Sequence, residues 1–201
     1  MKTAKITSIK KIAIKQPCYD IMVEQNSNFF ANNILVHNCT MYTDYIHARS
    51  IDGRSHPSRD WVKQFHGTFK HNIPENWRIC GENLYAKHSI GYDNLQTYFM
   101  VFSIWDENNN CLSWEDTVEW CKMLELYHVP VLYTGKIATE DTIKAFNHII
   151  KDNKEGYVVR LAESFSYDNF DKSVAKFVRP NHVTTSDHWA HSEIIPNKLM
   201  N

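Results

Sequence analysis

The length, composition and charge of this chain exclude several classes of protein. Its 201 residues are 43% hydrophobic and 13% aromatic, which suffices to build a packed core in one large or two small domains. The net charge of −1 excludes a strongly basic protein, so any contact with nucleic acid must come from a local patch.

The cysteines and the apolar stretches exclude further classes of protein. Five cysteines without a CxxC pair argue against a disulfide framework or a zinc knuckle, and a reducing compartment fits them best. No apolar stretch is long enough to span a bilayer. We therefore expect a cytoplasmic protein without a membrane partner.

Residues 1–38 are expected to form short β-strands separated by asparagine-rich turns. Isoleucine and lysine alternate loosely over residues 2–15, and a second strand is predicted at residues 19–24. Asn32 and Asn33 form a turn before the apolar run at residues 34–36. This pattern predicts a small β-rich fragment.

Two helices are predicted in the rest of the chain. Residues 114–127 place Val118, Cys121 and Leu124 on one helical face, after a polar start at Ser113. A second helix is predicted at residues 139–151, again after a threonine and acidic residues.

Strands are predicted between and after these helices. Residues 98–105 and 156–161 are expected to be buried strands, because they are rich in β-branched or aromatic residues, and residues 173–179 form another. Helices mixed with antiparallel strands indicate an α+β fold.

The tripeptide His37, Asn38 and Cys39 combines groups that suit a self-cleaving junction. The Cys39 thiol can attack an upstream ester or thioester, and the Asn38 side-chain amide can close on its own backbone carbonyl. That closure cuts the bond between residues 38 and 39, and His37 is placed to donate a proton to the departing amine or to polarise the carbonyl.

The sequence YDIMVEQNSNFFANNILVHNC, residues 19–39, resembles the C-terminal end of inteins. It has a YD-x-x-VE strand, an N-F turn, an apolar strand and His-Asn before Cys. The resemblance implies that residues 1–38 are the C-terminal fragment of a split intein with a Hint-type fold. Ser27 stands where inteins usually carry His, and Asn26 where Asp is frequent. The resemblance also implies a partner, an N-terminal intein and extein polypeptide that supplies the first splicing nucleophile.

From Cys39 onward the sequence resembles the RNA-ligase branch of the covalent nucleotidyltransferases. The K-x-D-G motif, whose lysine takes AMP in that family, is absent from the sequence. The resemblance therefore implies that the intein interrupts the ligase just after that motif, with the lysine on the other polypeptide. The remaining motifs follow in family order as HARS at residues 47–50, ICGENL at 79–84, FMVFSI at 99–104, EGYVVR at 155–160 and AKFVR at 175–179.

These motifs imply roles for five residues. Arg49 would contact phosphate or ribose and Glu82 the ribose, while Phe102 would stack on adenine. Glu155 would serve the divalent metal, and Lys176 would hold the α-phosphate. A carboxylate for Mg²⁺ and cations for phosphate are the groups that phosphoryl-type transfer requires.

Two positions depart from the family pattern. Ser103 replaces an aspartate in the strand motif, and Val178 replaces the second lysine of the last motif, for which Arg179 is a possible substitute.

The hypothesis from the sequence is a precursor that undergoes trans-splicing and delivers part of an RNA ligase using ATP and Mg²⁺. Residues 1–38 would be the intein fragment, 39–183 an incomplete nucleotidyltransferase domain with antiparallel sheets and flanking helices, and 184–201 a tail. RNA ends, or DNA ends, would be the substrate. The alternatives are a DNA ligase or other nucleotidyltransferase, and a nucleic-acid-binding protein that kept the fold without catalysis.

Overall fold

The computed structural model describes residues 38–48, 56–87, 91–136, 156–178 and 194–200. The chain divides into two compact units, Met1–Asn33 and Ile34–Asn201, and every described residue belongs to the second. Among these residues, no helix has both the length and the apolar character needed to cross a membrane. The predicted helix at residues 139–151 and the predicted intein fragment up to residue 37 lie outside the described residues.

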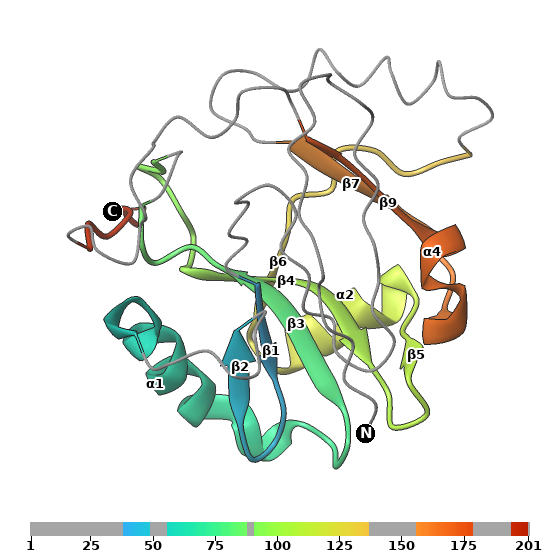
Figure 1. Cartoon of the computed structure of the whole chain (residues 1–201), viewed down its shortest axis with the longest axis horizontal. Helices are drawn as coiled ribbons and strands as arrows, with labels where there is room; N and C mark the ends of the chain where they lie inside the picture. Colours follow the sequence, from blue (N-terminus) through green and yellow to red (C-terminus); the bar gives the residue numbers. More distant parts are fainter. Residues whose placement is uncertain (1–37, 49–55, 88–90, 137–155, 179–193, 201) are drawn as a thin grey trace, which may run out of the picture. The chain divides into compact units, whose positions relative to one another are not determined.

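Most strands of the second unit belong to one seven-stranded sheet (Figure 1). Its neighbours are antiparallel except for β6, which runs parallel to β4. The predicted α+β class with antiparallel sheets is confirmed. The order is β2 (Ile46–Ala48), β1 (Asn38–Met41), β3 (Arg78–Asn83), β4 (Phe99–Trp105), β5 (Asn110–Cys111) and β8 (Phe165–Ser166), with β6 (Tyr127–His128) beside β4.

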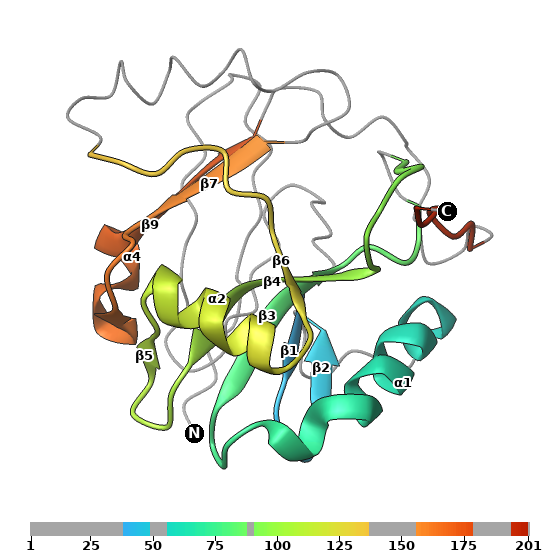
Figure 2. The ribbon, with the colours of Figure 1, turned by 180° about the vertical axis from the view of Figure 1, so that it is seen from behind.

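The helices α1 (Asp60–Phe69) and α2 (Trp114–Met123) pack against one face of this sheet. In Figure 1, α2 lies behind β3 and β4, and in Figure 2, the view from behind, it lies in front of them. Burial of large apolar side chains between helices and sheet supplies most of the driving force for folding. The core side chains are Cys39, Met41, Val62, Phe69, Ile73, Ile79, Phe99, Val101, Ile104, Cys121, Leu124 and Leu126.

Helix α2 begins where the sequence predicted and ends earlier. The Ser113 hydroxyl accepts a hydrogen bond from the Asp116 amide at 3.0 Å and caps the first turn. The predicted end at residue 127 is wrong, because Glu125 has a φ of 56° and stops the helix. Tyr127 instead belongs to β6 and is 47% exposed.

Helix α1 is not among the helices that the sequence predicted. The 3-10 turn η1 (Pro57–Arg59), capped by His56, leads directly into the helix. Val62, His66 and Phe69 form its buried face. The apolar pattern is hidden in the sequence because its middle member is a histidine, which is 5% exposed and donates from Nε2 to the Tyr42 carbonyl.

A second, two-stranded sheet pairs β7 (Gly156–Arg160) with β9 (Val174–Val178). The strands were predicted, but the expectation that residues 156–161 are buried is wrong. Val158 is 59% exposed, because β7 pairs only with β9 among the described residues. The short helix α4 (Phe170–Ser173), preceded by η4 (Tyr167–Asn169), leads into β9.

The described end of the chain, residues 194–200, packs against residues 84–87 and 92–98. Asn197 is 5% exposed and donates from Nδ2 to the Leu84 carbonyl at 2.8 Å, while its Oδ1 accepts from the Tyr92 amide at 2.9 Å. The Asn197 backbone carbonyl accepts from the Tyr98 hydroxyl at 2.9 Å. This part of the expected tail is therefore held by buried hydrogen bonds to the segment that follows β3.

Candidate nucleotide site and the junction at residues 38 and 39

The face of the seven-stranded sheet opposite the helices carries the candidate nucleotide site. Across β1, β3 and β4 the register aligns Thr40 with Cys80 and Cys80 with Ser103. Asn38 is aligned with Glu82 on the neighbouring strand. Aligned side chains of antiparallel strands share a face, and the 3.8 Å contact between Thr40 Oγ1 and Cys80 Sγ agrees with this. Glu82 therefore lies beside Asn38 on this face.

Phe102 is the extra residue of a β-bulge in β4. The register skips it, since Gly81 is aligned with Val101, and Cys80, the residue before Gly81, is aligned with Ser103. Val101 is fully buried against the helices, so the alternation of side chains along the strand places Phe102 on the opposite face. The bulge thus puts Phe102 and Ser103 together on the face of the candidate site.

Ser103 has a structural role that accounts for its departure from the family pattern. Its hydroxyl accepts a hydrogen bond from Trp105 Nε1 at 3.0 Å, and the residue is only 8% exposed. A hydroxyl satisfies the indole here without the desolvation cost of a buried carboxylate.

Asn38 and Cys39, the residues of the predicted junction, lie in β1, inside the sheet. Cys39 is aligned with Ala48 on β2 and with Gly81 on β3, and Asn38 is aligned with Glu82 on β3. Cys39 is 2% exposed, and burial, with a further contribution from Glu82, raises the pKa of its thiol to about 12. In this conformation the thiol is protonated and shielded from solvent, which is unsuited to nucleophilic attack.

Gly81 shows how tightly the sheet is packed beside the junction. A Cβ at this position would lie 2.3 Å from Phe99 Cζ and 2.7 Å from the Met100 carbonyl oxygen. Only glycine fits at this contact, because the Met100 backbone cannot move away as a flexible side chain would.

Lys176 lies on the other sheet, in β9, aligned with Val158 of β7. Lys176 is exposed, as is Val158. The side chain of Arg160, at the end of β7, donates from Nη1 to the Phe102 carbonyl at 3.3 Å and from Nη2 to the Leu112 carbonyl at 2.8 Å. Through Arg160, the strand pair that carries Lys176 is tied to the strand that carries Phe102.

The structure brings only some of the predicted site residues together. Asn38, Cys39, Glu82 and Phe102 lie on three adjacent strands, whereas Lys176 is on the second sheet. Cys39 differs from the other three because its side chain faces the helices. The predicted site residues outside the described part of the chain are His37, Arg49 and Glu155.

No metal site is formed by the part of the chain that the structure describes. In that part, no group of three or more His, Cys, Asp and Glu side chains is arranged to hold an ion. Burial raises the pKa of the thiols of Cys111 and Cys121 to about 11, so these cysteines are not reactive thiolates.

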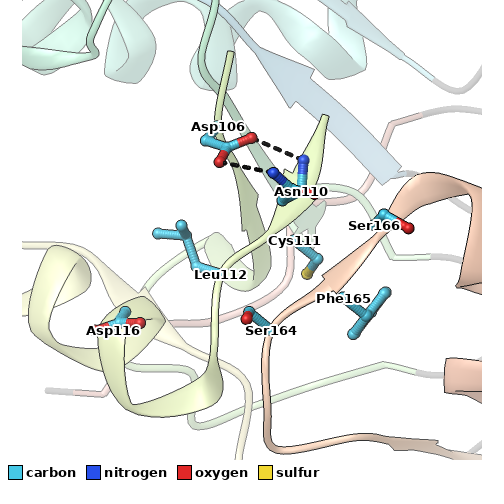
Figure 3. A pocket seen from close by; sticks show the side chains of 8 residues that line it. All are labelled: Asp106, Asn110, Cys111, Leu112, Asp116, Ser164, Phe165 and Ser166. Carbon is cyan, nitrogen blue, oxygen red and sulfur yellow. Dashed lines mark hydrogen bonds between the residues drawn. The ribbon is translucent and has the colours of Figure 1, made fainter. Parts of the chain in front are cut away.

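A shallow pocket lies apart from the predicted site residues (Figure 3). One side is the turn between β4 and β5, where both carboxylate oxygens of Asp106 accept hydrogen bonds from Asn110. None of the five described site residues lines it. The pocket is lined by Asp106, Asn110, Cys111, Leu112, Asp116, Ser164, Phe165 and Ser166.

The sequence interpretation missed Arg160 and Asn83 as structural parts of the site. Asn83 is 4% exposed, donates to the Ser58 carbonyl and accepts from the Tyr85 amide, which fixes the backbone just after Glu82. Both residues stand inside motifs that were recognised. The signals available in the sequence were the arginine at the end of a predicted strand and the asparagine directly after Glu82.

A protein-family model described as RNA ligase matches residues 32–178. The match spans all the strands described above and includes residues 32–38, which precede Cys39. No curated protein and no solved structure matches the chain. Because the family match covers well over half of the sequence, the chain belongs to the RNA ligase family.

Proposed function

We propose that this chain is the precursor of part of an ATP-dependent RNA ligase, completed by protein trans-splicing. The family supports an RNA-ligase-type activity. The observation that carries the nucleotide-binding part is the placement of Glu82 and Phe102 on one face of adjacent strands β3 and β4. This arrangement offers a carboxylate for a ribose hydroxyl next to an aromatic face for adenine.

The reaction follows from the groups that bind ATP. A lysine on the upstream polypeptide attacks the α-phosphorus and displaces pyrophosphate, AMP then moves to a 5′-phosphate end, and a 3′-hydroxyl displaces AMP to seal the strand. Lys176 and Arg49 neutralise the charge that builds on the α-phosphate as pyrophosphate leaves. Adenine stacks on Phe102, while Glu82 fixes the ribose.

The residue that we expect to hold Mg²⁺ lies outside the described part of the chain. Glu155 directly precedes β7 and supplies an oxygen ligand of the kind Mg²⁺ prefers. The ion would neutralise phosphate oxygens during the transfer. Lys176, on the partner strand of β7, would act on the same phosphates.

The splicing part of the proposal is supported by the intein-like sequence that ends at Asn38. The Cys39 thiol attacks the carbonyl carbon of the upstream thioester or ester, so the upstream segment moves to Cys39 and the thiol or hydroxyl of the partner's first intein residue is released. The Asn38 side-chain nitrogen then attacks its own carbonyl carbon, which forms a succinimide and frees the Cys39 amine, protonated with help from His37. Acyl transfer from sulfur to nitrogen leaves a peptide bond.

The buried position of Cys39 sets an order for these events. The thiol is buried once β1 has paired with β2 and β3. We therefore expect splicing to take place from a conformation in which β1 has not joined the sheet. Once residues 1–38 are released, Cys39 becomes a core residue of the ligase.

Adenylylation with labelled ATP tests the ligase part. The isolated chain is expected to form no covalent AMP adduct, because it lacks the K-x-D-G lysine. After joining to the N-terminal half, it should form one and seal RNA nicks. Glu82→Ala should reduce adduct formation by about tenfold or more, whereas replacement of the exposed Glu119 of α2 by Ala should not change it. An adduct on the isolated chain, or none after joining, would refute the assignment.

The same experiment distinguishes a second candidate function, nucleic-acid binding without catalysis. A protein that kept the ligase fold for nucleic-acid binding alone is suggested by Val178 in place of a lysine. The joined protein would then bind nicked RNA without forming the AMP adduct. Sealing of nicked DNA in preference to RNA would identify a DNA ligase instead.

A further inference from the structure

The Arg160 guanidinium joins two backbone carbonyls of the larger sheet region to β7. It reaches the carbonyls of Phe102 and Leu112 through Nη1 and Nη2, and its Nε donates to the Leu161 carbonyl at 3.0 Å. Charge-assisted bonds of this kind are stronger than neutral ones, and the planar fork fixes their directions.

Two aromatic rings hold the guanidinium in place. Its central carbon lies 5.6 Å from the centre of the Trp114 ring and 5.4 Å from that of the Phe165 ring. Both distances suit cation–π attraction. With three hydrogen bonds and two rings, the position of Arg160 is determined by β4, α2 and β8 together.

The hydrogen bond from Arg160 to the Phe102 carbonyl acts on the backbone of the bulge. A bulged residue leaves the regular ladder of the sheet, so its backbone depends on other partners. The direction of the Phe102 side chain follows from that backbone. Arg160 therefore stabilises the conformation in which Phe102 is presented.

We propose that Arg160 is a positioning residue, which sets the adenine platform Phe102 at a fixed distance from the strand pair carrying Lys176. This inference rests on the proposed function, in which Phe102 binds the base and Lys176 the α-phosphate. Val158, the aligned partner of Lys176, is two residues before Arg160 on β7. A single side chain thus links the parts that hold the two ends of AMP.

A double-mutant cycle on the spliced, complete ligase tests this. Arg160→Lys keeps the charge but loses the planar fork whose two nitrogens reach the two carbonyls, so the KM for ATP in adenylylation is expected to rise about tenfold, with kcat changed much less. Phe102→Leu should also raise KM. The KM of the double variant should exceed that of Phe102→Leu by no more than about twofold, because Arg160 acts through Phe102.

Arg78→Lys is the matched control. Its guanidinium also lies on an aromatic ring, 4.6 Å from the centre of Trp105, but it bonds the Asn109 side chain rather than the bulge. Its KM should stay within about twofold of wild type. If Arg160→Lys does not fold in a thermal unfolding assay, Arg160→Gln, which keeps an amide donor, replaces it in the cycle.

The outcomes separate this inference from the proposed function. If wild-type ligase forms the AMP adduct but the two KM effects multiply, Arg160 acts independently of Phe102 and the inference is overturned. A loss of kcat equal to the rise in KM overturns it as well, since that indicates general damage. If wild-type ligase forms no adduct, the proposed function itself fails.

Discussion

The seven-stranded sheet and the β7–β9 pair carry the candidate site in different ways. The helix-facing side of the large sheet is closed, with Met41 and Val101 fully buried and Cys39 nearly so. On the pair, Val158 and Lys176 are exposed. Residues such as Glu82 are thus positioned by a core beneath them, whereas Lys176 lies on a strand pair that Arg160 ties to β4. The difference predicts that the strands binding the base depend on the core, whereas the position of the pair that holds the phosphate depends on the contacts of Arg160.

The largest contrast is expected from removing a side chain in each region. Phe99→Ala deletes a ring that is 1% exposed and touches the Gly81 backbone, so it should lower the free energy of unfolding by about 3–5 kcal/mol. Val158→Ala should cost less than about 1 kcal/mol. Urea unfolding of both variants measures this, and equal losses would contradict the contrast.

The same Phe99 variant also probes the order of splicing and folding. Because it weakens the contact between β3 and β4 beside Cys39, it should leave splicing as fast as in wild type, or faster, while it reduces ligase activity. Slower splicing would mean that the folded sheet is needed for the reaction, contrary to the proposed order.

An intermediate effect is expected at the chain end that packs against residues 84–87 and 92–98. Asn197→Ala leaves the Leu84 carbonyl and the Tyr92 amide without this partner and should cost about 1–3 kcal/mol. Lys198→Ala is the control, because its ion pair with Asp93 is largely exposed and contributes little. Thermal unfolding measures the stability of both variants. Equal midpoints for the two variants would show that this end is not part of the packed unit.

The smallest effect is a dependence of stability on pH at His66. Burial lowers the pKa of its imidazole below the usual 6.5, so the native state prefers the neutral ring. The stability this provides is complete above pH 6.5 and is lost as the pH falls, by at most about 1.4 kcal/mol per pH unit. His66→Gln removes the titrating group, and an unchanged acid slope in urea unfolding at several pH values would contradict this.

The sequence predicted the elements whose patterns are local. Residues 98–105 and 173–179 are continuous β-rich runs and appear as β4 and β9. Helix α1 was missed because a buried histidine interrupts its apolar face, and α2 was predicted too long because a left-handed residue at 125 leaves no pattern.

Candidate site residues could be named from the sequence, whereas their geometry could not. Motif order indicated Glu82 and Phe102, and both lie on one face of the sheet. The bulge at Phe102 and the reach of Arg160 to its carbonyl depend on contacts between distant segments, which residue spacing does not encode. The burial of Cys39 follows likewise from the pairing of β1 with two strands.

The most direct test is the intact mass of the products when this chain is mixed with its N-terminal partner under reducing conditions. The account predicts release of residues 1–38 ending in a succinimide, and one new polypeptide in which the upstream segment continues into Cys39. Asn38→Ala should prevent this release. If residues 1–38 stay attached to the rest of the chain in wild type, the central claim is contradicted.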